Sequence, residues 1–114
     1  MSVAIHFARD YDDVVIYLAL RRYELGIASR VLDECAGCPS GWQSKIEAGC
    51  KTMGRSFQHI AGALGVLYLP VEGGLLLVAD DSSIPPVTRR HINSRGRASH
   101  SVTEKRRPLP AFAA

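Results

Sequence analysis

The feature that most constrains the fold is a series of glycines that divides the middle of the chain into short helical segments. The spacing of apolar residues predicts helices at about residues 12–25, 29–36, 40–48 and 56–65, and a glycine lies at or next to the end of each one. Only the tight turn at residues 37–39 separates the second helix from the third. Two short helices joined in this way form a helix-turn-helix motif, in which one helix can enter a DNA groove.

The hydrophobic pattern changes after the fourth helix. Two apolar runs flank Glu72-Gly73-Gly74, which is typical of a β-hairpin at about residues 66–79. Residues 80–114 are polar and basic, and this composition predicts a flexible tail. We therefore expect a mainly α protein, with one four-helix domain that includes the hairpin over residues 1–79 and a basic tail after it.

Charge is distributed unevenly along the chain. Residues 1–88 carry seven Lys/Arg against ten Asp/Glu, a net charge of −3, whereas residues 89–114 carry seven Lys/Arg against one Glu, a net charge of +6. A slightly acidic body with a basic tail is common in nucleic-acid-binding proteins, although a basic tail can also serve solubility alone. The charge therefore favours double-stranded DNA as a partner and leaves the solubility role as the alternative.

Several classes of protein are excluded by what the sequence lacks. No apolar run approaches the roughly 18–20 residues that a membrane span needs, and the first residues lack the basic and apolar regions of a secretory signal. We expect a cytoplasmic, nucleoid-associated protein. The sequence also shows no nucleophile–base pair, phosphate-binding glycine loop or paired catalytic carboxylates, so we expect neither an enzyme nor a cofactor.

The three cysteines leave a second kind of site open. Cys35 and Cys38 form a Cys-x-x-Cys pair, and Cys50 and His59 complete a set of four ligands of the type that zinc uses. Free cysteine usually behaves as a small buried apolar residue, which is the interpretation we favour here. We assign no metal ligands, and a zinc-stabilised domain stays as an alternative.

A set of apolar, small and charged residues at fixed spacing lies between about residues 14 and 66. Its members are Leu25-Gly26-Ile27, Leu32, Ala36-Gly37, Ser44-Lys45-Ile46-Glu47, Gly49, Ala61 and Ala63-Leu64-Gly65-Val66. In this set the chain resembles the helix-turn-helix domains of the phage Cro and repressor type, within the broad xenobiotic-response-element group of bacterial regulators. The resemblance implies a fold of the lambda-repressor type and a transcriptional regulator of bacterial or phage genes that binds specific DNA sequences, with the third helix in the major groove.

A second set of residues looks closer to a small branch of short bacterial and phage proteins that have a hairpin and a polar tail after the four helices. It consists of Ser29-Arg30-Val31-Leu32-Asp33-Glu34, the following Ala36-Gly37-Cys38-Pro39-Ser40-Gly41-Trp42 and the hairpin.

The resemblance also implies which residues meet the DNA: small residues of the third helix face base edges and a lysine faces a phosphate. From its own chemistry, Gln43 can pair with adenine if the helix is rotated. Trp42 either contacts the sugar-phosphate wall or covers the domain surface, and three further basic side chains are placed for phosphates. The full candidate set is Arg30, Ser40, Gly41, Trp42, Gln43, Ser44, Lys45, Lys51 and Arg55.

Three positions depart from the family pattern. Asp33 and Gln43 stand where apolar side chains usually pack, and Ser29 replaces a glutamine that braces the third helix. A buried polar group without a partner costs on the order of several kcal/mol, so either the helices splay, or Asp33 and Gln43 bond each other or nearby backbone. The departures favour an alternative function, a protein-interaction adaptor or inhibitor on a helix-turn-helix scaffold that no longer binds DNA.

The expected partners follow from the size of the motif. One helix in a groove buries little surface, so proteins of this kind usually bind DNA as dimers. The hairpin strands are apolar on both faces, so we expect a homodimer through the hairpin, joined edge to edge or stacked across a two-fold axis. Another transcription protein is the alternative partner.

Overall fold

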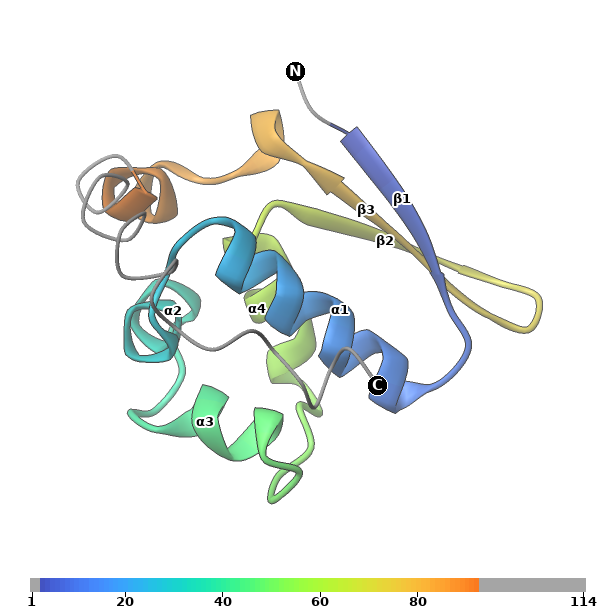
Figure 1. Ribbon diagram of the computed structural model, residues 1–114, viewed down its shortest axis with the longest axis horizontal. Coiled ribbons are helices and arrows are strands. Elements are labelled where there is room, and N and C mark those ends of the chain that lie inside the picture. The colour runs from blue at the N-terminus through green and yellow to red at the C-terminus, as the bar shows by residue number, and fades with distance from the viewer. Residues whose placement is uncertain (1–2, 93–114) are drawn as a thin grey trace.

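A computed structural model describes residues 3–92, which form a small α/β domain with a sheet on one side and helices on the other (Figure 1). The predicted helices and hairpin lie close to helices α1–α4 and strands β2 and β3. In chain order the elements are β1 (Val3–Ala8), α1 (Tyr11–Glu24), α2 (Ser29–Ala36), α3 (Trp42–Glu47), α4 (Ser56–Ala63), β2 (Val66–Val71), β3 (Gly74–Asp80), the 3₁₀ turn η1 (Asp81–Ser83) and a helix at residues 86–92.

The expected mainly α fold with an appended hairpin is wrong, because the N-terminal residues add a third strand to the hairpin. The sheet is antiparallel with the order β1-β3-β2, so β3 is central and Val78 lies between Ile5 of β1 and Leu67 of β2. An isolated hairpin is only marginally stable in water, and a third strand together with helix packing removes that weakness. The hairpin is therefore part of a sheet that the first residues of the chain complete.

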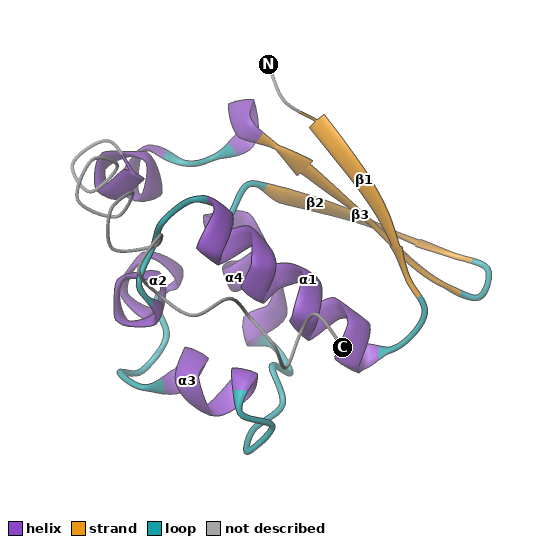
Figure 2. Cartoon of the chain, viewed as in Figure 1, coloured by secondary structure: helices purple, strands orange, loops and turns teal. Residues whose placement is uncertain are grey.

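The helices cover one face of this sheet (Figure 2). His6 of β1 stacks on Tyr17 of α1, with ring centroids 4.9 Å apart. At the opposite edge of the same face, Tyr68 of β2 meets Phe57 of α4, with ring centroids 4.7 Å apart. Leu77 of β3 lies between them and is fully buried.

No helix among residues 3–92 is long and apolar enough to cross a membrane.

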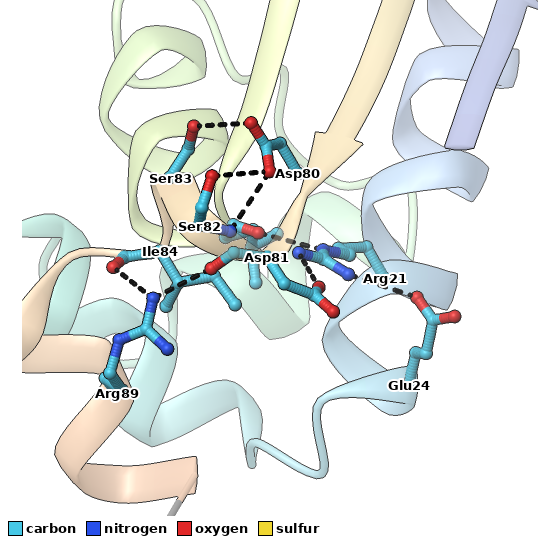
Figure 3. A network of polar contacts seen from close by, with 9 residues as sticks. Arg21, Glu24, Asp80, Asp81, Ser82, Ser83, Ile84 and Arg89 are labelled. Carbon is cyan, nitrogen blue, oxygen red and sulfur yellow. Dashed lines mark hydrogen bonds and ion pairs between the residues drawn. The ribbon is translucent and has the colours of Figure 1, made fainter. Parts of the chain in front are cut away.

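Residues 80–92, which were expected in the flexible tail, belong to the folded domain. Ile84 and Thr88 are buried, with 6% and 0% of their surface exposed. Arg21 of α1 holds this segment, because its Nη2 donates to Asp81 Oδ1 at 3.1 Å while its Nε donates to the Leu64 carbonyl at 2.9 Å (Figure 3). The rest of the predicted tail, residues 93–114, lies outside the described residues.

Gly65 makes this arrangement possible at the start of β2. Its φ of +69° lies in the left-handed region, and a Cβ added there would come within 2.6 Å of Ile84 Cγ1. Its carbonyl also accepts from the Asp80 N–H at 2.9 Å. Only a glycine combines this backbone conformation with the close approach of residues 80–84.

Candidate nucleic-acid interface

The start of α3 is held by a carboxylate from α2. Asp33 is 3% exposed, and its two oxygens accept hydrogen bonds from the backbone N–H groups of Gly41 and Gln43, each at 2.9 Å. Gly41 itself offers no side chain that can cap the helix. Asp33 therefore acts as a cap supplied from the neighbouring helix, and satisfies N–H groups that the start of a helix leaves without partners.

The end of α3 is held by an arginine from α1. Arg22 is 5% exposed and forms two hydrogen bonds with the Glu47 carboxylate, at 2.9 and 2.8 Å. Its Nη1 also donates to the Ile27 carbonyl at 2.8 Å. Burial disfavours the charge of Arg22, but the bonds to Glu47 outweigh this effect and raise its pKa above the usual value. A buried pair with this geometry fixes position, and removing one partner typically costs roughly 3–5 kcal/mol.

With both ends fixed, α3 turns a short polar face outward. Ser44 and Lys45 are exposed, whereas Ile46 is 3% exposed and faces the core. Ser44 Oγ lies 3.4 Å from Ser29 Oγ, so the start of α2 lies directly beside α3. Arg30 is the next residue of α2 and is exposed. The structure thus places two of the predicted basic residues, Arg30 and Lys45, on adjoining elements.

The loop after α3 folds back over the first turn of that helix. The Lys51 N–H donates to the Lys45 carbonyl at 3.3 Å, and Lys51 Nζ lies 5.6 Å from the centre of the Trp42 ring. Trp42 Nε1 donates to Ser56 Oγ at 3.1 Å, which brings the neighbouring, exposed Arg55 to the same region. Trp42 is partly buried and packs against the core, so it covers the domain surface and carries a cation on its face.

One predicted contact residue does not lie on this surface. Gln43 is 4% exposed, so its amide is not available to pair with adenine. It occupies the inner side of α3, and its Oε1 has no hydrogen-bond partner among residues 3–92. Asp33 bonds to the backbone N–H groups of Gly41 and Gln43, and not to the Gln43 side chain. The exposed members of the predicted set are Arg30, Ser40, Ser44, Lys45, Lys51 and Arg55.

The acidic side chains of the motif are mostly used inside the domain. Asp33 is buried against two N–H groups, and Glu47 is paired with Arg22. Glu34 is exposed on α2, one helical turn after Arg30. The charge that α3 and its neighbouring loops turn to solvent is therefore mainly positive, as a surface for phosphates requires.

The cysteines do not form a metal cluster in the described part of the chain. No group of three or more His, Cys, Asp or Glu residues among residues 3–92 is arranged to hold a metal ion. Cys35 faces the helix at residues 86–92, where its Sγ lies 3.9 Å from the Val87 carbonyl. Burial raises the pKa of both Cys35 and Cys38, which favours the neutral thiol.

Two determinants of this site were missed in the sequence. Asp33 was identified as unusual, but its role as a cap for another helix depends on the angle at which α2 and α3 cross. The Arg22–Glu47 pair joins residues 25 positions apart, and the local pattern of α1 does not say which residue pairs with Arg22. An arginine on the apolar face of α1 was the one available signal, because arginine is almost never fully buried unless it is paired.

A scan against protein-family models, a search of curated proteins and a search of solved structures find no match to the chain.

Proposed function

We propose that the protein binds double-stranded DNA through α3 and regulates transcription of bacterial or phage genes. The observation that carries this proposal is the pair of buried polar contacts that fixes α3 at both ends, Asp33 at its start and Arg22–Glu47 at its end. These contacts place acidic groups inside the domain and leave Ser44 and Lys45 outside. A rigid, exposed helix with small polar and basic side chains suits insertion into the major groove.

Basic residues lie on the elements next to α3 and support contacts to phosphates. Arg30 follows Ser29, whose Oγ lies 3.4 Å from Ser44 Oγ, and Lys51 Nζ lies 5.6 Å from the centre of the Trp42 ring. No side chain caps the start of α2 at Ala28, so its first N–H groups are available to a phosphate oxygen, and the helix dipole favours a negative charge there. Phosphate contacts would fix the position of the domain, while Ser40 and Ser44, which the family resemblance assigns to base-contacting positions, would meet base edges.

The test is a fluorescence-anisotropy titration of the full chain on a random duplex, at about 50 and about 200 mM salt. We expect the affinity to fall at least about 100-fold between the two salt concentrations, because bound phosphates release counterions. Lys45→Ala and Arg30→Ala should each weaken binding and reduce the slope of log affinity against log salt by about 1.

Arg9→Ala is the matched control for these variants. Arg9 is exposed in the β1–α1 connection, away from α3 (Figure 1), and its loss changes the net charge by the same amount. If Arg9→Ala reduces the slope of log affinity against log salt as much as Lys45→Ala and Arg30→Ala do, the net charge of the protein alone attracts the DNA. Binding that is absent, or independent of salt, would overturn the proposal.

The alternative function, an adaptor or inhibitor that binds another protein, has one observation in its favour. Glu34 is exposed on α2 close to Arg30 and would repel phosphates near the start of the helix-turn-helix. Stronger DNA binding by Glu34→Gln would show that the Glu34 carboxylate repels phosphates bound beside it, and this result would support DNA binding over the adaptor. If the chain binds no DNA, the adaptor becomes the better proposal.

We also propose that the protein acts as a homodimer to which the hairpin strands contribute. One short α3 of six residues offers little surface for useful affinity. A second copy would supply a second α3 and raise the apparent affinity through the second binding event.

A further inference from the structure

A cavity lies between the second half of α1 and the paired strands β1 and β3. It has a volume of about 290 Å³ and is partly open to solvent. On α1 its wall is a stripe of side chains at positions i, i+3, i+4 and i+7, which face the same side of a helix. On the sheet, one residue of each strand closes it. The lining residues are Ala4, Tyr17, Leu20, Arg21, Glu24 and Ala79.

The cavity exists because the sheet carries small side chains at this place. Ala4 and Ala79 are partners across β1 and β3. The next pair on the same face is His6 and Leu77, and there the space up to α1 is filled, since the His6 ring stacks on Tyr17. A cavity of about 150 Å³ can hold benzene, so this one has room for an aromatic ring with a short side chain.

The walls combine an apolar body with two charged groups. The alanine methyl groups and Leu20 supply apolar surface, and Leu20 is a large apolar residue that stays 43% exposed on α1. Arg21 and Glu24 bring the charges, and Arg21 is only 5% exposed. Apolar walls with a few convergent polar groups are typical of sites for small molecules.

The hydrogen bonds of the two charged residues indicate which ligand charge fits. Each side-chain nitrogen of Arg21 has an acceptor, because Nε donates to the Leu64 carbonyl, Nη1 to Glu24 Oε1 at 3.4 Å and Nη2 to Asp81 Oδ1 at 3.1 Å (Figure 3). Two carboxylates therefore neutralise one guanidinium. The Glu24 side chain is 69% exposed, and only its Oε1 has a hydrogen-bond partner among residues 3–92. The unused capacity of the cavity is thus for a donor with a positive charge.

We propose that this cavity binds a small organic cation, namely a protonated primary amine on an apolar body. The ammonium group would donate to Glu24, and the apolar body would lie against Leu20 and the two alanines. A carboxylate ligand fits less well, because it would approach Arg21 beside two carboxylates that already neutralise it. The site goes beyond the proposed DNA binding and does not depend on it.

The test is an NMR titration of the ¹⁵N-labelled full chain without DNA. The probes are 2-phenylethylamine, 2-phenylethanol and 3-phenylpropanoate, which share one apolar body and differ in charge. We expect the amine to bind with a dissociation constant of about 0.1 to 10 mM. The alcohol should bind about two- to five-fold more weakly, because an exposed ion pair contributes little, and the acid should bind most weakly. The amides of residues 17–24 and 79 should shift.

Three variants of the full chain separate the charge from the cavity. Glu24→Gln keeps the size of the side chain, so it should lower the affinity for the amine to that for the alcohol and leave the alcohol unchanged. Glu72→Gln, in the exposed hairpin turn, is the matched control for charge and should bind both probes as the wild type does. Ala4→Leu fills the cavity from an exposed position of β1 and should weaken all three probes, while thermal melting checks that each variant is folded.

An acid that binds as tightly as the amine, or an affinity for the amine that Glu24→Gln does not change, would overturn the assignment of an amine. The site itself would be overturned if none of the probes shifts residues 17–24 saturably, or if a folded Ala4→Leu binds them as the wild type does. Because the titration contains no DNA, neither result bears on the proposed function. A chain that binds no DNA would likewise leave this site intact.

Discussion

Asp33 is the residue on which the position of α3 depends most. It is buried, it belongs to α2, and both of its oxygens accept from the backbone at the start of α3. Hydrogen bonds to a charged group contribute about 1.5–3 kcal/mol each, and removal of the acceptor leaves buried N–H groups unsatisfied. We predict that Asp33→Ala lowers the free energy of unfolding by roughly 2–4 kcal/mol, measured by urea denaturation.

Glu34→Ala is the control for this change, because Glu34 is the neighbouring, exposed acidic residue and its loss alters the net charge equally. Its effect should stay within about 0.5 kcal/mol, as for most surface substitutions. If the two variants unfold at the same urea concentration, Asp33 does not cap α3.

At the scale of elements, the connection between β3 and the 3₁₀ turn η1 depends on Asp80. Its side chain accepts from the Ser82 hydroxyl at 2.8 Å and from the Ser82 N–H at 3.0 Å (Figure 3). These bonds favour the carboxylate and hold the pKa of Asp80 below its usual value. Because the pKa is lower in the folded state, the stabilisation is present at neutral pH and disappears as the pH falls through the folded pKa.

We therefore predict that Asp80→Asn lowers the melting temperature at pH 7, and that the difference from the wild type shrinks as the pH falls through the lowered pKa of the Asp80 carboxyl. Asparagine resembles a protonated aspartate in shape, so this variant isolates the charge. Glu72→Gln, in the exposed hairpin turn, is the control and should show no such convergence. A difference between Asp80→Asn and the wild type that stays constant with pH would contradict this role.

At the scale of the whole molecule, local patterns predicted the helices, the turn and the hairpin, because helical periodicity and glycine positions act over a few residues. They did not predict the fold class. Residues 3–8 are too short an apolar stretch to be assigned alone, and they become a strand only by pairing with β3, at the other end of the domain. The burial of Ile84 against Gly65 is equally non-local.

In the candidate site, too, local sequence patterns predicted some features, and contacts between separate helices determine the others. Exposed basic and small polar residues around the turn were predicted from local spacing. The inward rotation of Gln43 and the cap from Asp33 depend on how α2 and α3 cross, and the Arg22–Glu47 pair depends on where α1 packs. The sequence could therefore predict which residues are candidates for DNA contact, but not which polar groups hold them in place.

The most direct test of the central claim, that α3 and its basic surroundings form a DNA-binding surface, is NMR chemical-shift mapping of the ¹⁵N-labelled full chain with a short random duplex. The amides of Ser29, Arg30, Ser44, Lys45 and Lys51 should shift most, and those of β1–β3 should shift little. Shifts confined to the sheet, or none among residues 29–55, would contradict the account.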